Sequence, residues 1–319
     1  FFIFSITLVS ASDINTSNNH IQPDNKSVYY EIQKIDHAPL NPVKKSAAKD
    51  FDFFGLFNFG KEKKIGYWVW SSDMKKVDLD ELSKNGVNVI FLNSYAFTEY
   101  GQREVLDWVT DAKNHGIEVH VWMQIFYNDG WVSPLMNGTP DVRLFNNKID
   151  EAKYYAGLSE ISGIQMDYIR YEGDAYKYEN GTSAINQFVQ NFSRSVKEVN
   201  PDLTVSATVM PECDKDEYYY GQDIHEISKH VDVIVPMMYK GNYKQESDWI
   251  EPIANWFVIN SGDADVWCGL QIYESDNNIT SLPVDEIMKD KDYAFNGGAE
   301  GIIYFRWGMS DELDHKKLN

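Results

Sequence analysis

Eight short strand-like runs recur along the chain from residue 65 onward, and stretches with helical periodicity separate them. Residues 102–116 form one such stretch and end in the Gly expected just past a helix, whereas residues 183–201 end at Pro201. This alternation predicts an α/β fold with a parallel sheet. The eight predicted strands cover residues 65–70, 87–93, 118–126, 163–170, 203–210, 233–239, 265–273 and 301–308.

Eight strand-helix units within about 250 residues have the size and order of a TIM (β/α)8 barrel. The chain has 319 residues, 43% of them hydrophobic, which is enough for one large core. We therefore predict a barrel domain over residues 61–319, with a short eighth helix near its end. A doubly wound open sheet is the structural alternative. Only two cysteines occur, Cys213 and Cys268, and their positions argue against a bridge between them, so stability has to come from packing.

The first 60 residues differ in composition from the predicted barrel. Residues 1–11 form an apolar run that ends in small residues, which predicts a secretory signal peptide whose start is truncated. Residues 12–60 are rich in Asn, Ser, Lys and Pro, and they predict a linker or irregular surface arm. Its segment FDFFGLFNFG, residues 51–60, is expected to dock on the main domain or on a partner, because five exposed Phe rings are costly in water.

The net charge and the hydropathy of the chain exclude some classes of binding partner. Asp plus Glu outnumber Lys plus Arg by 49 to 29, and the formal net charge of −20 makes nucleic acid an unsuitable partner. No later segment is apolar enough to cross a bilayer. We expect a secreted or cell-surface protein, with an uncleaved N-terminal anchor and association with the cell envelope as the alternative.

Strand parity predicts which side chains reach the interior of the barrel. Active sites of such barrels lie at the carboxyl ends of the strands, and alternate residues of each strand point inward. The residues predicted to face inward are His120, Trp122 and Gln124 in the third run; Gln165 and Asp167 in the fourth; Ser206, Thr208, Met210 and by extension Glu212 in the fifth; and Trp267, Gly269, Gln271 and Tyr273 in the seventh. Cys268 is expected to face the helices.

Two of these residues, Asp167 and Glu212, are carboxylates on neighbouring strands. A pair of carboxylates at one barrel mouth is typical of glycoside hydrolysis, in which one acts as acid and base and the other attacks the anomeric carbon or activates water. We favour the retaining course. The alternative role for Asp167 is an ion pair with Arg170. The expected substrate-binding residues are Trp68, Trp70, Gln124, Gln165, Arg170, Tyr239, Gln271, Tyr273 and Arg306, since aromatic faces stack on sugar rings and polar groups bind hydroxyls.

We expect neither a metal nor another cofactor. The segment HEISKH resembles a zinc-protease motif, but His225 and His230 are five positions apart and lie about 140° apart around a helix. One metal ion could hardly take both side chains. No phosphate-binding glycine loop and no serine nucleophile elbow is present.

Two of the strands carry a family resemblance. The run GIQMDYIRY, residues 163–171, resembles the Gly-φ-x-φ-Asp-Tyr-Ile-Arg-Tyr strand of a (β/α)8-barrel family assigned as glycoside hydrolases and related to the alpha-amylase clan. The run VDVIVPMMYKGNY, residues 231–243, resembles the second characteristic strand of that family. The order agrees as well, because VSATV lies between the two. The resemblance implies a barrel fold and a polysaccharide or oligosaccharide substrate.

The resemblance also implies roles for particular residues. Asp167 takes the place of the clan nucleophile at the end of the fourth strand, and Arg170 stands where a basic residue follows. Glu212 falls near the acid/base of the fifth strand. Gln165 departs from the pattern, because the clan carries Arg there and the relatives often carry His. We therefore expect an exported glycoside hydrolase that uses Asp167 and Glu212. The main alternative is a non-catalytic carbohydrate-binding barrel at the cell surface.

Overall fold

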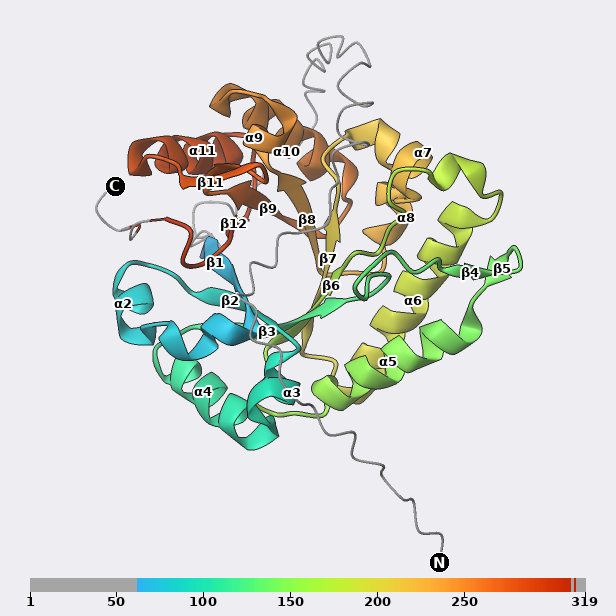
Figure 1. Cartoon of the computed structure of the whole chain (residues 1–319), viewed down its shortest axis with the longest axis horizontal. Helices are drawn as coiled ribbons and strands as arrows, with labels where there is room; N and C mark the ends of the chain where they lie inside the picture. Colours follow the sequence, from blue (N-terminus) through green and yellow to red (C-terminus); the bar gives the residue numbers. More distant parts are fainter. Residues whose placement is uncertain (1–61, 311–312, 314–319) are drawn as a thin grey trace, which may run out of the picture.

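The computed structural model describes residues 62–310 and 313, and it contains one closed barrel of eight parallel strands (Figure 1). The strands run around the barrel in the order β1-β2-β3-β6-β7-β8-β9-β12, and β12 pairs with β1 to close it. This confirms the predicted barrel, and the alternative of an open sheet is wrong. Their bounds are β1 (Lys64–Val69), β2 (Val89–Asn93), β3 (Glu118–Gln124), β6 (Gly163–Asp167), β7 (Thr204–Val209), β8 (Val233–Met238), β9 (Asp265–Gln271) and β12 (Gly301–Phe305).

Helices surround the barrel, and two short hairpins extend its loops (Figure 1). The hairpins are β4 (Leu135–Met136) with β5 (Thr139–Pro140), and β10 (Tyr273–Ser275) with β11 (Asn278–Ser281). The α-helices are α2 (Leu79–Lys84), α3 (Ala96–Tyr100), α4 (Gln102–Asn114), α5 (Val142–Ala156), α6 (Gly181–Val199), α7 (Asp216–Tyr220), α8 (Ile224–Ile227), α9 (Lys240–Tyr243), α10 (Ile250–Asn260) and α11 (Val284–Asn296). The 3₁₀ helices are η2 (Ser71–Lys76), η3 (Ala175–Lys177), η4 (Cys213–Lys215) and η5 (Ser247–Trp249).

The two predicted helices that were delimited from the sequence are present as α4 and α6. In α4 the buried residues Val105, Val109 and Ala112 recur at helical spacing and face the barrel. The helix ends before Gly116, which has a φ of +74° that Gly adopts without steric cost. Helix α6 buries one apolar stripe in the same way and ends just before Pro201.

Strand parity separates two apolar layers. Val205, Ala207 and Val209 of β7 belong to the large cluster between strands and helices, as predicted. A second cluster fills the barrel interior and contains Trp68, Phe91, Trp122, Val235, Trp267 and Phe305, among others. Neither cysteine forms a disulfide, and Cys268 is fully buried on the helix side, which confirms both expectations.

Some strands are shorter than predicted. The fourth strand ends at Asp167 rather than at Arg170, because Tyr168 turns the chain with a φ of +55°. The fifth strand ends at Val209, so the residues that follow it belong to a loop. These early ends matter because parity no longer decides where the later side chains point.

The predicted signal peptide (1–11), the surface arm (12–60) and most of the short eighth helix (311–319) lie outside the described residues. These segments, and the domain boundary before residue 61, stay predictions. Within the described part of the chain, no helix is both long and apolar enough to cross a membrane.

A buried ionic network fastens α9 to α11. Lys240 is 4% exposed, and its Nζ donates to Ser247 Oγ at 3.0 Å, to Glu286 Oε1 at 2.6 Å and to Asp290 Oδ1 at 2.9 Å. Asp290 is itself 1% exposed. The network sets the position of α9, whose later residues reach the carboxyl end of the barrel.

Lys240→Met should lower the free energy of unfolding by about 3 kcal/mol, because it leaves the buried carboxylate of Asp290 without its cation. Urea unfolding followed by circular dichroism measures the change. Lys229→Met is the matched control: Lys229 pairs with Glu226 on the surface, so its loss should cost under about 1 kcal/mol. Equal losses in both variants would contradict a structural role for the network.

Candidate active site

Asp167 occupies the last position of β6, at the carboxyl end of the barrel, and is 8% exposed. Trp122 Nε1 donates to its Oδ2 at 2.8 Å, and the backbone N–H of Tyr168 donates to its Oδ1 at 2.8 Å. Burial raises the pKa of Asp167 above its ordinary value, while these two donors and the charge of Arg170 lower it. Each carboxylate oxygen thus has one N–H donor that favours the ionised form.

Glu212 is not on the inner strand face, where extension of the fifth strand had placed it. It follows the end of β7 in the loop before η4, and Cys213 then reverses the chain with a φ of +60°. The carboxylate is nevertheless held firmly, because the hydroxyls of Tyr220 and Tyr243 donate to Glu212 Oε1 at 2.9 and 2.7 Å. The loop, rather than strand parity, therefore sets its position.

A second acid, Asp216, lies against Glu212. The backbone N–H of Glu212 donates to Asp216 Oδ1 at 3.0 Å, and the two side chains are within hydrogen-bonding reach of each other. Glu212 Oε2 and Asp216 Oδ2 are buried and accept no N–H or O–H from any other described group. Burial raises the pKa of both acids, and the charge of Glu212 raises the pKa of Asp216 further. Two adjacent buried carboxylates cannot both ionise cheaply, so their proximity favours retention of a proton by the pair, and the pKa of Asp216 is the more strongly raised of the two.

Arg170 connects the surroundings of the two candidate catalytic acids. It is 4% exposed, its Nη1 donates to Tyr171 O, and its guanidinium lies 4.4 Å from the ring of Trp131 and 5.4 Å from the ring of Tyr220. It therefore stacks on aromatic rings and acts on Asp167 through its charge, without a direct ion pair. The alternative prediction, an ion pair between Asp167 and Arg170, is therefore wrong.

The predicted substrate-binding residues differ in burial, and two of them lie deep inside the barrel. Trp68 and Gln165 are 1% and 0% exposed. The prediction that they contact substrate is therefore wrong, because neither side chain is accessible to a ligand. Trp68 Nε1 donates to Gln165 Oε1 at 3.0 Å, and Gln165 Nε2 donates to Thr208 Oγ1. These three residues form a hydrogen-bonded layer inside the barrel.

Trp70, Gln124 and Arg306 are partly exposed at the same end of the barrel. Gln124 pairs with Asp167 in the register of β3 with β6, so the two lie side by side. The ring of Trp70 lies 4.7 Å from that of Trp122, which itself holds Asp167. Arg306 Nη1 donates to Asp73 Oδ2 at 3.1 Å. These residues remain available to a ligand, and their role as substrate contacts stays a prediction.

The loops after β8 and β9 contribute a polar network that the sequence did not reveal. Gln271 Nε2 donates to Asn242 Oδ1, and Asn242 Nδ2 donates to Asp276 Oδ2 at 2.9 Å. Tyr273 donates its hydroxyl to Asp276 Oδ1 at 2.7 Å. Gln271 and Tyr273 are 2% and 4% exposed, and Tyr239 is 8% exposed with its ring stacked on Phe305 at 5.4 Å. These groups brace the site wall more than they face solvent.

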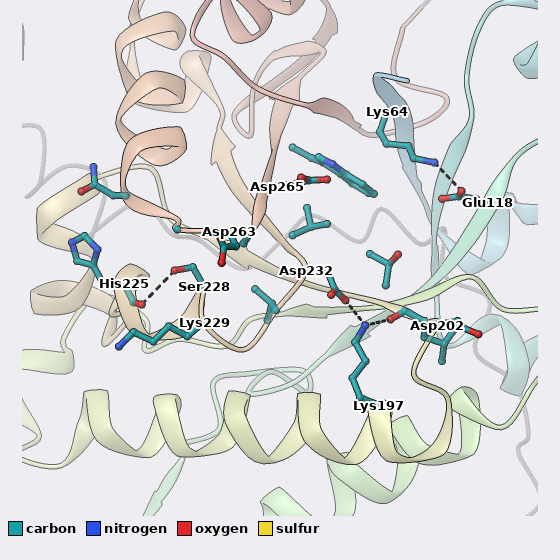
Figure 2. A pocket seen from close by; sticks show the side chains of 18 of the residues that line it. Lys64, Glu118, Lys197, Asp202, His225, Ser228, Lys229, Asp232, Asp263 and Asp265 are labelled. Carbon is teal, nitrogen blue, oxygen red and sulfur yellow. Dashed lines mark hydrogen bonds and ion pairs between the residues drawn. The ribbon is translucent and has the colours of Figure 1, made fainter. Parts of the chain in front are cut away.

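A cavity of about 920 Å³ lies at the opposite end of the barrel. It is lined by the first residues of five strands, Lys64, Glu118, Thr204, Val233 and Asp265. Figure 2 shows that charged side chains surround it, including the ion pairs Lys64–Glu118 and Lys197–Asp232, both at 2.8 Å. Because catalytic groups of such barrels lie at the carboxyl ends of the strands, this cavity is separate from the candidate active site.

Within residues 62–310, no group of three or more His, Cys, Asp or Glu side chains could hold a metal ion. Both oxygens of Asp167 and Oε1 of Glu212 accept from Trp, Tyr and backbone donors.

A family model described as "Putative glycosyl hydrolase domain" matches residues 63–261, which is more than half of the chain. The chain belongs to this family. The match spans β1 to α10 and includes Asp167, Glu212 and Asp216. The relation to the alpha-amylase clan stays a prediction. None of the curated proteins matches the chain in sequence.

Solved structures of glycoside hydrolases share the fold. The PgaB (BpsB) glycoside hydrolase domain from Bordetella bronchiseptica superposes with a TM-score of 0.60 at 11% identity, covering 78% of this chain and 95% of that one. A chitinase from Chromobacterium violaceum gives 0.59 at 14% identity, covering 79% and 96%. An endo-1,4-beta-D-mannanase from Thermotoga petrophila gives 0.56 at 12% identity, covering 76% and 88%. At such low identity, these likenesses show the barrel fold alone.

Three residues at the site were missed by sequence reasoning. Asp216 and Tyr220 lie four and eight positions after Glu212, and strand periodicity says nothing about a loop that turns back on itself. Tyr243 is the last residue of α9, which follows β8, and it meets Glu212 only in the folded barrel. The clustering of acids and tyrosines in the stretch PECDKDEYYY was the available signal.

Proposed function

We propose that this chain is a glycoside hydrolase that cleaves the O-glycosidic bonds of a polysaccharide, with Asp167 as nucleophile and Glu212 as acid and base. The observation that carries the proposal is the contrast between the two buried carboxyls. Asp167 has an N–H donor on each oxygen, whereas Glu212 has a second acid beside it. Burial raises the pKa of both acids, but the two N–H donors favour the ionised form of Asp167, whereas the adjacent acid favours retention of a proton on the Glu212–Asp216 pair. One ionised carboxyl and one that carries a proton are typical of acid/base pairs in glycosidases.

In the first step of a retaining mechanism, a carboxylate oxygen of Asp167 forms a bond to the anomeric carbon. The bond from that carbon to the glycosidic oxygen breaks, and the oxygen takes the proton of Glu212. In the second step, Glu212 removes a proton from water, which attacks the anomeric carbon and releases Asp167. The Trp122 N–H stabilises Asp167 in its charged form both before attack and after release.

The predicted signal peptide supports export and action at the cell surface or in the surroundings. Structures with the same fold include enzymes named for chitin and mannan, which supports a polysaccharide as substrate without choosing one.

The proposal is tested by incubating the full chain with soluble and insoluble polysaccharides and measuring the reducing ends that it releases. Proton NMR of the first product then gives the anomeric configuration. Release of a product with the substrate configuration supports the retaining mechanism, and release with the opposite configuration overturns the nucleophilic role of Asp167.

A non-catalytic carbohydrate-binding barrel is the second candidate. It is favoured by the state of Glu212, whose Oε2 is buried and whose Oε1 already accepts two tyrosine hydroxyls. Binding of a polysaccharide without any release of reducing ends, unchanged in an Asp167→Asn variant, would establish this function instead.

Trp122→Phe should raise the pKa of Asp167 further, because it removes one of the donors that stabilise the carboxylate. Since the nucleophile has to be ionised, the acidic limb of the kcat/KM profile should move to higher pH. Trp68→Phe is the matched control, because its indole N–H serves Gln165 and not Asp167. An acidic limb at the same pH in both variants would argue against Asp167 as the ionising group.

A further inference from the structure

Five tyrosines gather on the loop after β6 and on α7; three of them are exposed, and the mechanism does not use the group. This tyrosine cluster consists of Tyr171, Tyr176, Tyr178, Tyr218 and Tyr219. Tyr218, Tyr176 and Tyr178 are 56%, 50% and 41% exposed, although most large aromatic side chains of the described barrel are buried. Several exposed aromatic rings that adjoin one another indicate a binding surface more strongly than a single ring does.

The rings of the cluster hold one another in fixed orientations. Tyr176 and Tyr218 stack with centroids 4.9 Å apart and an interplanar angle of 9°. Tyr219 stands edge-on to Tyr218 at 5.0 Å and 90°, and Tyr178 stacks on Tyr171 at 4.9 Å and 18°. Because the rings already restrict one another, a ligand that stacks on them would lose little of its binding energy to ordering side chains.

The cluster continues from the candidate active site. Its residues come from the loop after β6, which begins beyond Asp167, and from α7, which follows Glu212. The backbone N–H of Tyr171 donates to Tyr220 O at 3.0 Å and joins the two loops, and the side chain of Tyr220 reaches Glu212. Tyr219 packs with Tyr220 against Met210, at the carboxyl end of β7. The cluster thus extends outward from the wall that carries the acids.

The charges around the cluster restrict its ligand. Acids outnumber bases on the two loops, so the local field disfavours an anionic polymer. Of the two bases, Lys177 lies 3.5 Å from Asp174 and is partly neutralised by it. Apart from Glu212, the acids of these segments that are not buried are Glu172, Asp174, Glu179, Asp214 and Glu217, and the bases that are not buried are Lys177 and Lys215.

We propose that the tyrosine cluster is a second sugar-binding site, which holds an uncharged polysaccharide chain that extends from the active site. Tyrosine rings offer flat apolar faces to the C–H faces of pyranose rings, and their hydroxyls bond to sugar hydroxyls. The inference rests on the proposed function, which makes a glycan the ligand, and it adds that the ligand is a long neutral chain. A glycan that carries carboxylates would be repelled by the surplus of acids around the cluster.

The test compares the wild-type chain with a Tyr176→Ala/Tyr218→Ala double variant. With Asp167→Asn in both to prevent turnover, we expect the double variant to bind insoluble chitin, β-1,4-mannan or cellulose, whichever the parent binds, roughly tenfold more weakly. With Asp167 intact, KM for the polymer should rise by a similar factor, whereas kcat/KM for a disaccharide or trisaccharide of the same sugar should change less than about twofold. A uniform loss on short and long substrates would indicate a structural defect and overturn the proposal.

Tyr154→Ala is the matched control, because Tyr154 is 47% exposed on α5, within a helix and outside the loops that carry the acids. It should leave binding of the polymer unchanged. Polymer affinity that is equal in the double variant and its parent would overturn the proposal, as would tyrosine-dependent binding of polygalacturonate in place of the neutral polymers. Wild-type dimerisation that the double variant abolishes would assign the cluster to a second copy of the chain instead.

Failure of this inference and failure of the proposed function give different results. Hydrolysis by wild type with no effect of the tyrosine substitutions refutes only the second site. Tyrosine-dependent binding of a neutral polymer, without hydrolysis by wild type, supports the second site and refutes the catalytic proposal.

Discussion

Asp167→Asn should lower kcat on any glycan that the wild-type chain hydrolyses by about 10⁴-fold or more, because an amide cannot attack the anomeric carbon. Its fold should persist, since the Asn carbonyl can still accept one of the two N–H groups that Asp167 binds. The amide nitrogen would face the other donor, which costs about 1–3 kcal/mol at a buried site.

Single-turnover and steady-state assays with the same polysaccharide measure this loss, and circular dichroism checks the fold. Asp141→Asn is a matched control, because Asp141 caps α5 by accepting from Leu144 N and Asn caps helices equally well. It should be fully active. Retention of more than a tenth of wild-type kcat by Asp167→Asn would remove Asp167 from the chemistry.

Glu212→Gln should lower kcat by about 10³-fold on substrates with a poor leaving group, because Gln has no proton to give. Substrates with an activated aryl leaving group depend less on protonation and should lose much less in the first step. The contrast between the two substrate types is the measurement. Equal losses of kcat on both substrate types would indicate that Glu212 stabilises the loop and does not transfer the proton.

Asp216→Asn replaces the titratable neighbour of Glu212 with a neutral side chain of nearly the same shape. The Asp216 side chain lowers the pKa of Glu212 through a hydrogen bond that stabilises the Glu212 carboxylate. An Asn amide can donate to the same carboxylate, so the alkaline limb of kcat/KM, which reports loss of the Glu212 proton, should move little. The Asn carbonyl can still accept from Glu212 N, so the loop contact remains.

The same substitution has an expected effect on stability. Burial first, and the charge of Glu212 second, raise the pKa of Asp216 above its unfolded value. The folded chain then binds the proton more tightly than the unfolded chain, so wild-type stability falls as pH rises from the unfolded pKa toward the folded pKa. Asp216→Asn lacks this fall, and its stability relative to wild type should increase with pH in urea unfolding. A difference that does not depend on pH would contradict the raised pKa.

The sequence was most informative where a period repeats. Strand and helix alternation predicted the barrel, and inward parity placed Asp167 at its mouth, because regular backbone forces side chains to alternate. The same reasoning named Glu212 but placed it wrongly on the inner strand face, since β7 ends at Val209 and the turn at Cys213 breaks the alternation. It also wrongly predicted that Trp68 and Gln165 contact substrate, because parity shows that a residue faces inward but not how deep it lies in the barrel.

The sequence by itself determined the architecture, the inward acid of the fourth strand and the membership of a glycosyl hydrolase family. Only the tertiary structure decided what surrounds each acid. The Trp122 donor comes from β3, and the hydroxyls on Glu212 come from α7 and α9. Protonation depends on burial and on partners within a few ångströms, and those partners are brought together by closure of the barrel rather than by proximity along the chain.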